Sequence, residues 1–573
     1  LDATASEDVL AAASRPLGHW RALLLEAVHR KRATGSWGKP EQIDFDPAAV
    51  PLPTFLPLVR IRAEALTLAG KPAEAYGLLM RGLQRFDRYL PFFLYAVKLI
   101  NDTRSDGPVL RFLERAAALG ADPFTLAFEY GRYYKNRGDL KTAEKWFSRA
   151  IALKPADARA WLMRGDCRRF TGRRAEAMED YRTAYNHDPT LTVALVNLAI
   201  LSFESGEIQV AAQLFDEAVA ADPSFASAWV ERANFKAAIG LMQEAEKDYL
   251  EAARLTPKDP YPLFRLAEAW LRNGDYEAAR RYAEAALERK ADYAPALVVL
   301  GDAARSEGDM RGAASYYRRA LDSSPGDFTA ARSLAAALLT LRDVKGARAA
   351  AMTALAAFDM DPLSNYVLAM TDLARGRFDA ARSRLRFLLD DDIGYAPAWY
   401  GLALLEFATG RTAIAVSRLE TAIRWKPDPA WVLFRAQLAL LDPAFALEDA
   451  ERVVSLLADP ADRLLVDVAR AALAKDETAL RSAVAGLAKI PSRAKLAAVL
   501  EKALNAPNPS ARPPSIRPPQ RTVACFYLAL VLYGRGRTDG AVRMLRFNLR
   551  SNDYLTPEYH LSAVLAARLE TSP

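Results

Sequence analysis

The sequence predicts an all-α solenoid of antiparallel helix hairpins, because three features repeat with one 34-residue period. Glycines recur on a single register, an alanine follows each register position by five residues, and a residue with little or no side chain precedes it by seven. The register glycines are Gly138, Gly172, Gly206, Gly240, Gly274, Gly308, Gly376 and Gly410, and Arg342 occupies the one remaining position between them. A fixed period of this size is typical of stacked repeat proteins.

A single period explains why these residues give a hairpin. Residues 158–170 have helical spacing, and Gly172 is expected to end this helix because glycine accepts the left-handed backbone conformation. A second helix is expected over 174–186, and Pro189 stops it. The two helices then lie antiparallel.

Small residues are expected where the two helices of a hairpin cross. Gly165 and Ala177 are predicted to face each other, since a large side chain there would overpack the crossing. One hairpin cannot bury its apolar face alone, so neighbouring hairpins must stack.

These residues resemble the tetratricopeptide repeat. The matching positions of three units are Trp161, Gly165, Gly172, Ala177, Tyr181, Ala184 and Pro189; Trp229, Ala233, Gly240, Ala245, Tyr249, Ala252 and Pro257; and Trp399, Ala403, Gly410, Ala415, Ala422 and Pro427. The resemblance implies a right-handed superhelix in which the first helix of each hairpin lines the concave face.

The register also divides the chain. We expect an N-terminal arm, helix and connector over 1–55, divergent repeats over 56–123, nine regular repeats over 124–429, irregular helical hairpins over 430–504, a proline-rich linker over 505–520, and a C-terminal hairpin with a capping helix over 521–573. The register fails after Pro427, and Ala529, Gly536 and Ala541 restore its spacing. The last helix, residues 556–569, is expected to cover the open end of the stack.

Composition excludes several classes of protein. The chain has 573 residues, which is too long for one compact core but not for a solenoid. It contains no run of about 20 apolar residues, so no membrane span is expected. Cys167 and Cys525 are the only cysteines, which excludes a disulfide framework, and Cys167 is expected to be a small buried side chain.

The sequence offers no catalytic, cofactor-binding or metal-binding residues. The four histidines, His19, His29, His187 and His560, are not paired with other metal ligands or with a nucleophile motif. Phosphate-loop, nucleophile-elbow and zinc-protease motifs are absent. We therefore predict that the chain is not an enzyme and carries no cofactor.

The resemblance predicts which residues face the concave groove. The expected partner-binding residues change from basic to apolar and aromatic along the chain: Phe128, Arg132, Lys135, Arg159, Arg169, Val196, Ile200, Phe203, Val230, Asn234, Tyr261, Phe264, Tyr366, Met370, Tyr400, Leu404 and Phe407. An exposed apolar patch of this kind usually marks a contact. The alternative is that neighbouring helices cover these side chains.

Positive charge is concentrated near the C-terminus. The expected basic patch consists of Arg512, Arg517, Arg521, Arg535, Arg537, Arg543, Arg546 and Arg550. Such a patch could meet an acidic polymer, an anionic lipid or an acidic protein. Aromatic residues are not interleaved with these arginines, so we rank an acidic protein or an intramolecular contact ahead of a nucleic acid.

These observations favour a non-catalytic scaffold that organises other proteins into a larger assembly. The alternative is a receptor for an extended peptide or an anionic polymer, either a polysaccharide or a nucleic acid, bound at the basic end of the groove or by the C-terminal arginines. By analogy with family members, a bacterial envelope or periplasmic assembly, which could be membrane-associated, is favoured over the cytoplasm. A further hypothesis is that the linker 505–520 lies back in the groove.

Overall fold

The computed structural model describes residues 90–103, 109–441, 459–506, 520–550 and 556–571, together with positions 62, 66, 74, 77, 457 and 553. These residues form α-helices and short turns without any strand, which confirms the predicted all-α fold. The expected arm and connector of 1–55, most of the expected repeat at 56–89, and residues 507–519 of the proline-rich linker lie outside the described residues.

The chain forms two compact units, Leu1–Thr256 and Pro257–Pro573. The described helices of the first unit are α5 (Leu90–Thr103), α6 (Val109–Ala118), α7 (Pro123–Asn136), α8 (Leu140–Leu153), α9 (Ala158–Phe170), α10 (Arg174–His187), α11 (Thr192–Glu204), α12 (Ile208–Ala221), α13 (Ala226–Ala238) and α14 (Met242–Leu255). Each odd-numbered helix from α7 to α13 packs against the helix that follows it. Four antiparallel hairpins result, and they stack in chain order.

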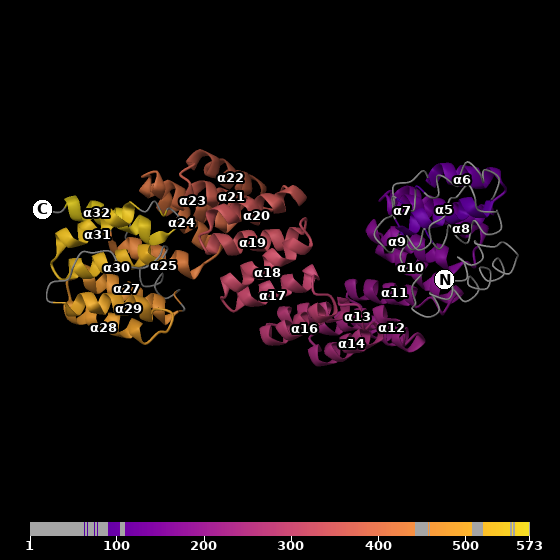
Figure 1. The fold of residues 1–573 in the computed structure, drawn as a ribbon, viewed down its shortest axis with the longest axis horizontal. Coiled ribbons are helices and arrows are strands. Elements are labelled where there is room, and N and C mark those ends of the chain that lie inside the picture. Colours follow the sequence, from indigo (N-terminus) through magenta and orange to yellow (C-terminus); the bar gives the residue numbers. More distant parts are fainter. Residues whose placement is uncertain are drawn as a thin grey trace, which may run out of the picture. The chain divides into compact units, whose positions relative to one another are not determined.

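The second unit continues the hairpins and ends in a different arrangement. Its described helices are α15 (Tyr261–Arg272), α16 (Tyr276–Arg289), α17 (Ala294–Ser306), α18 (Met310–Ser323), α19 (Phe328–Thr340), α20 (Val344–Ala357), α21 (Pro362–Ala374), α22 (Phe378–Asp391), α23 (Ala396–Ala408), α24 (Thr412–Trp425), α25 (Pro429–Leu441), α27 (Pro460–Leu473), α28 (Glu477–Ala488), α29 (Ala494–Asn505), α30 (Gln520–Gly534), α31 (Thr538–Leu549) and α32 (Pro557–Thr571). Helices α15–α24 form five hairpins, and α25 and α27–α32 gather into a compact group (Figure 1).

Left-handed residues connect the two helices of each hairpin. The register glycines have φ between +70° and +86°. In the turn at Gly172, the N–H of Arg173 donates to the carbonyl of Arg168 at 2.9 Å, which satisfies a carbonyl at the end of α9. The glycines therefore provide the backbone conformation that ends the first helix.

Arg342 makes the same turn without being a glycine. Its φ is +62°, and the N–H of Asp343 donates to the carbonyl of Leu338 at 2.9 Å. A left-handed conformation costs an L-residue roughly 1–2 kcal/mol. The side chain makes a compensating contact, because its Nη2 donates to Oγ1 of Thr556, 214 residues further on, at 3.0 Å.

Gly165 permits the close approach of α9 and α10, although its neighbour differs from the prediction. A Cβ placed at Gly165 would lie 2.7 Å from the ring of Tyr181, and Asp180 is the next residue that it would meet. Tyr181, rather than Ala177, therefore faces this glycine. Gly131 has the same relation to Phe147, with a Cβ-to-ring distance of 2.6 Å.

Tryptophans at equivalent positions join successive hairpins. The Nε1–H groups of Trp161, Trp229 and Trp399 donate to the carbonyls of Pro155, Pro223 and Ile393 at 2.8, 2.9 and 2.8 Å. Each acceptor lies six residues earlier, in the loop that enters the hairpin. The tryptophan therefore fixes the angle at which its helix follows the preceding repeat.

The sequence predicted that the last helix covers the open end of the stack. In the structure, this helix also contacts earlier helices. Helix α32 packs against α30 and α31, and it also contacts α23 and α25. The ring of His560 lies 5.5 Å from that of Phe407 and 6.4 Å from that of Phe434. One apolar core, extending from Ala369 to Leu569, joins the last hairpins to the C-terminal group.

We predict that Gly165→Leu lowers the free energy of unfolding by about 2 kcal/mol, because the new side chain would collide with the buried ring of Tyr181. Chemical denaturation measures this loss. Ala175→Leu, at an exposed position of α10, is the control and should change stability little. Equal losses in both variants would show that the crossing at Gly165 is not tightly packed.

We predict that Arg342→Gly loosens α32 while leaving α20 intact. Glycine removes the backbone strain at this turn, but the contact to Thr556 is lost. Hydrogen exchange should therefore accelerate in residues 557–571 and stay the same or slow in residues 344–357. Thr556→Val, which deletes the acceptor hydroxyl, should reproduce the first effect without the second. Unchanged exchange in α32 in both variants would contradict the role given to Arg342.

Candidate functional site

The first helices of the hairpins form the inner side of each stack. Within each unit, first helices of successive hairpins contact one another, as α11 and α13 do and as α19 and α21 do. Among the described residues, second helices make no comparably close contacts with one another. The stack therefore curves toward the first helices, and the predicted groove residues lie on the helices that line this inner side.

The basic end of the predicted groove is neutralised by ion pairs. Arg132 pairs with Glu129 at 3.2 Å, Arg159 with Asp157 at 2.6 Å, and Arg169 with Glu204 at 3.7 Å. Lys135 pairs with Asp166 of the next repeat. Each of the four predicted cations thus has a carboxylate partner, so this end offers no cluster of uncompensated positive charge. Phe128, the remaining residue here, is half-buried beneath the guanidinium of Arg159, 5.5 Å from its ring.

The apolar part of the first unit is partly covered. Val196 and Val230 are buried, so they pack inside the stack. Ile200 and Phe203 are only half-buried, and the ring of Phe203 meets that of Phe235 edge-on at 5.2 Å. Asn234 accepts a hydrogen bond from the hydroxyl of Tyr249 at 2.6 Å. Of the predicted groove residues on α11 and α13, Ile200 and Phe203 are the apolar ones that stay partly exposed.

The second unit shows the same division. Tyr261 is 39% exposed, and Phe264 beside it is half-buried, with ring centres 6.2 Å apart. Tyr366 and Phe407 are also half-buried. Tyr261 and Phe264 therefore offer an aromatic surface at the first hairpin of this unit.

Three predicted groove residues of the second unit are buried: Met370, Tyr400 and Leu404. The ring of Tyr400 stacks on that of Trp431 in α25, with ring centres 4.8 Å apart. Tyr400 belongs to α23, and the C-terminal helix α32 packs against that helix. These side chains belong to the core that joins the hairpins to the C-terminal group. They cannot form an open docking surface while that group is in place.

The arginines of the predicted C-terminal basic patch differ in their exposure and contacts. Arg512 and Arg517 lie outside the described residues, as does the side chain of Arg521. Arg535 donates to the carbonyls of Ala503 and Ala506 at 3.0 and 2.7 Å, which ties α30 to the end of α29. The remaining members, Arg537, Arg543, Arg546 and Arg550, are exposed on α31 and at its ends.

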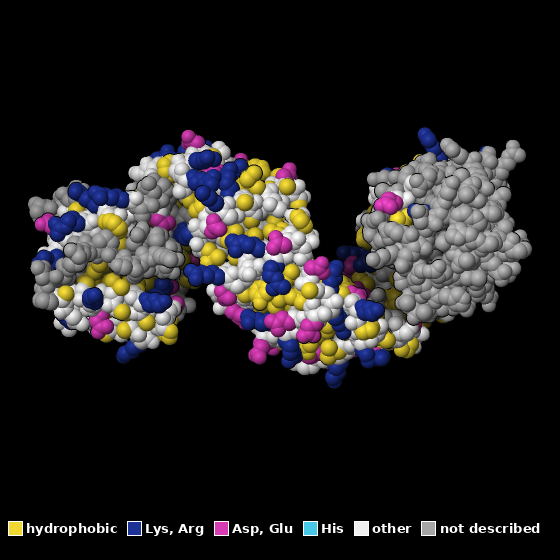
Figure 2. All heavy atoms as spheres, in the orientation of Figure 1, with side chains coloured by type: hydrophobic (Ala, Val, Ile, Leu, Met, Phe, Trp, Pro, Cys, Tyr) yellow, Lys and Arg dark blue, Asp and Glu magenta, His cyan; other side chains and the backbone are white. Residues whose placement is uncertain are grey.

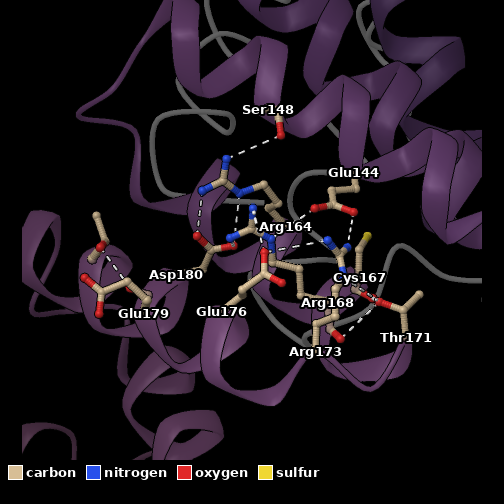
Figure 3. Close-up of polar contacts among 11 residues, drawn as sticks. Glu144, Ser148, Arg164, Cys167, Arg168, Thr171, Arg173, Glu176, Glu179 and Asp180 are labelled. Carbon is tan, nitrogen blue, oxygen red and sulfur yellow. Dashed lines mark hydrogen bonds and ion pairs between the residues drawn. The ribbon is translucent and has the colours of Figure 1, made fainter.

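A polar network on the second-helix side joins the first two regular hairpins (Figure 3). Arg168 of α9 bonds Glu144 of α8 and Asp180 of α10, both at 3.0 Å, and Arg173 also pairs with Glu144. Arg164 holds Asp180 at 2.7 Å. Burial raises the pKa of Glu144, but the hydrogen bonds from Arg173 and Arg168 outweigh this effect and lower the pKa below its ordinary value. Glu144 therefore stays ionised.

The central ion pair of this network recurs with its polarity reversed. Six and seven periods after Glu144 and Arg168, the equivalent positions hold Arg348 with Asp372 at 2.8 Å, and Arg382 with Glu406 at 3.7 Å. Lys and Arg side chains gather near α22 in Figure 2. A pair that works in either polarity fastens one hairpin to the next and carries no specific chemistry.

An open cavity of about 770 Å³ lies beside this network. Its lining residues are Lys141, Glu144, Lys145, Ser148, Thr171 and Arg173. All the predicted groove residues lie on first helices, so this cavity on the second-helix side was not predicted from the sequence. Comparison of second-helix positions along the register could have found it, since three cations converge here.

Among the described residues, no group of three or more histidine, cysteine or acidic side chains could hold a metal ion. Burial raises the pKa of the Cys167 thiol to about 12. In the described parts of the chain, no helix has the length and apolar character needed to cross a membrane.

Comparison with known proteins identifies repeats in three segments. Residues 135–370 match the model of the C-terminal domain of cilia and flagella-associated protein 70, and residues 372–438 and 522–546 match two tetratricopeptide repeat models. No curated protein matches the chain.

Solved structures of similar fold have low sequence identity. Yeast Tom70 is 13% identical with a TM-score of 0.40, and the match covers 70% of this chain and 95% of Tom70. PilF of Pseudomonas aeruginosa is 20% identical with a TM-score of 0.30, covering 36% of this chain and 95% of PilF. A tetratricopeptide repeat protein of Parabacteroides merdae is 17% identical with a TM-score of 0.35, covering 44% and 98%.

We predict that Cys167 resists alkylation in the folded protein. With a pKa of about 12, roughly one thiol in ten thousand is ionised at pH 8, whereas an unfolded cysteine is substantially ionised. Mass spectrometry after iodoacetamide treatment should find Cys167 unmodified until denaturant is added. The unfolded thiol loses its proton near pH 9 and the folded one does not, so this group lowers stability as the pH rises from about 9 to 12. Rapid modification of the native protein would contradict this assignment.

Proposed function

The chain belongs to the tetratricopeptide repeat family, and we propose that it is a non-catalytic scaffold whose first-helix surface holds other proteins in a larger assembly. Proteins built from tetratricopeptide repeats generally mediate protein–protein interaction, and the family is typically non-catalytic. The observation that carries the proposal for this chain is the set of apolar side chains left partly exposed on first helices: Ile200 and Phe203 in the first unit, and Tyr261 and Phe264 in the second.

Stacking of the repeats leaves part of the apolar surface of the first helices in contact with solvent. Side chains that only stack repeats become buried, as Val196 and Val230 are. Phe203 and Tyr261 occupy related faces of their helices but keep contact with solvent. Aromatic residues are enriched at protein interfaces because they bury much area with little loss of conformational entropy. An apolar side chain or helix of a partner would complete their burial.

The partners best suited to this surface are peptide segments or helices with apolar anchors. The alternative is a receptor for an extended peptide or an anionic polymer, and one form of it places the polymer at the basic end of the groove. That form has less support, because Arg132, Arg159 and Arg169 already hold carboxylates. A polymer would have to displace those partners before it gained any electrostatic attraction.

Site-specific photo-crosslinking tests the proposal. A photoreactive amino acid at Tyr261 should capture partner proteins in cells, because that side chain lies on the proposed surface. The matched control is Leu250, which has a similar exposed fraction, 41% against 39%, but lies on the second helix α14. Tyr261→Ser should weaken the binding of each captured partner by roughly tenfold, as expected for the loss of a buried aromatic anchor.

The protein must remain folded for this comparison to be informative. Tyr261 is exposed, so the melting temperature of Tyr261→Ser should match that of Leu250→Ser. Equal crosslinking from both positions would contradict the proposal, because it would show that the first-helix surface has no preference over the outer surface.

A further inference from the structure

The cavity beside α8 contains three cations that converge from two elements. Lys141 and Lys145 lie one turn apart on α8, and Arg173 reaches the same cavity from the turn between α9 and α10. Both lysines are exposed, and among the described residues no carboxylate lies within ion-pair distance of either ammonium group. Two like charges one turn apart on a helix repel each other. We call this set of lining residues the outer groove.

The acidic groups around the outer groove are already engaged. Glu144 is bound by Arg168 and Arg173. Asp139 caps α8 by accepting a hydrogen bond from the N–H of Thr142 at 3.1 Å. A hydrogen bond from the Thr142 side chain is the largest cause of the lowered pKa of Asp139, the backbone N–H bond comes next, and Lys145 adds a smaller contribution. Glu144 is therefore paired with arginines, and Asp139 attracts Lys145 only weakly.

Packing of the repeats does not require these cations. One period later, the positions of Lys141, Lys145 and Arg173 are held by Ala175, Glu179 and Glu207, and the hairpin is formed equally well. These positions are free to vary, so the positive charge here is a local property of this pair of hairpins.

Arg173 occupies a position that several other hairpins fill with an aspartate. Its position is the N-cap of the second helix, and Asp139, Asp275, Asp309 and Asp343 fill it with a side chain that bonds the helix backbone. Arg173 makes no such capping bond. Glu207, Leu241, Arg377 and Arg411 hold the same position without a capping bond, so the hairpin does not require an aspartate there.

We propose that the outer groove binds carboxylate side chains of an acidic segment of a partner protein. The Cα atoms of Lys141 and Lys145 are about 6 Å apart along the helix axis, and each side chain carries one ammonium group. Alternate side chains of an extended segment are about 6.6 Å apart, which matches this spacing. The hydroxyl of Ser148 lines the same cavity, accepts a hydrogen bond from Arg164 at 3.3 Å, and can donate its own proton to a carboxylate.

An acidic protein segment fits this groove better than a continuous polyanion. Glu144 and Glu176 lie among the cations in Figure 3 and would repel an evenly charged phosphate backbone. A peptide can place its acidic side chains at the lysines and leave neutral residues beside the carboxylates. This site lies on the second-helix side, so the proposal is independent of the scaffold function of the first-helix surface.

Fluorescence anisotropy with the full chain tests this inference. The probe is a labelled twelve-residue peptide of alternating glutamate and serine. Lys145→Glu should weaken its binding at least about fivefold, and Lys141→Glu/Lys145→Glu should weaken it further, because attraction becomes repulsion. Binding should also fall as salt is raised.

Lys247→Glu is the matched control. Lys247 is an exposed lysine at the equivalent register position of α14, three periods after Lys145. Its replacement by glutamate changes the net charge by the same amount as Lys145→Glu. The control should bind the peptide as the unaltered chain does. Equal weakening by Lys145→Glu and Lys247→Glu, or no binding of the peptide at all, would overturn the proposal.

A single-stranded oligonucleotide of the same charge provides the second arm. If it binds more tightly than the peptide and Lys145→Glu removes that binding, the groove is a nucleic-acid site and the assignment to an acidic protein segment is wrong. Photo-crosslinking from Tyr261 should be unaffected by Lys145→Glu, so the two proposals fail separately.

Discussion

Each of the nine hairpins from α7 to α24 depends on one residue with positive φ between its two helices. The turn must reverse the chain within a few residues while satisfying the carbonyls at the end of the first helix. A left-handed residue does both, because the following amide then reaches back five residues, as from Arg173 to Arg168. The stack follows from this turn, since antiparallel helices of fixed length repeat at a fixed angle.

At Arg342, a strained backbone conformation is accompanied by a long-range side-chain contact. Any L-residue there carries backbone strain, yet arginine also reaches Thr556 at the start of α32. A glycine would relax the turn and leave that contact unmade. The register position thus links the middle of the solenoid to its C-terminal group, and the strain is offset by an interaction that the hairpin itself does not need.

The sequence predicted local structure closely and long-range burial poorly. The helix expected at 158–170 is α9, and the following helix begins at Arg174 as expected, because glycine spacing and caps act within one period. The burial of Tyr400 and Leu404 could not be predicted, because it depends on α25 and on the return of α32 to α23. The neutralisation of Lys135 by Asp166 arises between repeats, so only a comparison across the register would have shown it.

In this solenoid, the positions that determine helix packing differ from the positions that are open to other molecules. Positions at the helix crossing, such as Gly165, are constrained by a ring packed against them. Positions on the outer side are not, and the ion pair of Glu144 with Arg168 works equally well as Arg348 with Asp372. Since the fold tolerates either sign, charge at these positions carries no information about folding. Lys141 and Lys145 are likewise not required by the hairpin, and we therefore infer that they serve contact with another molecule.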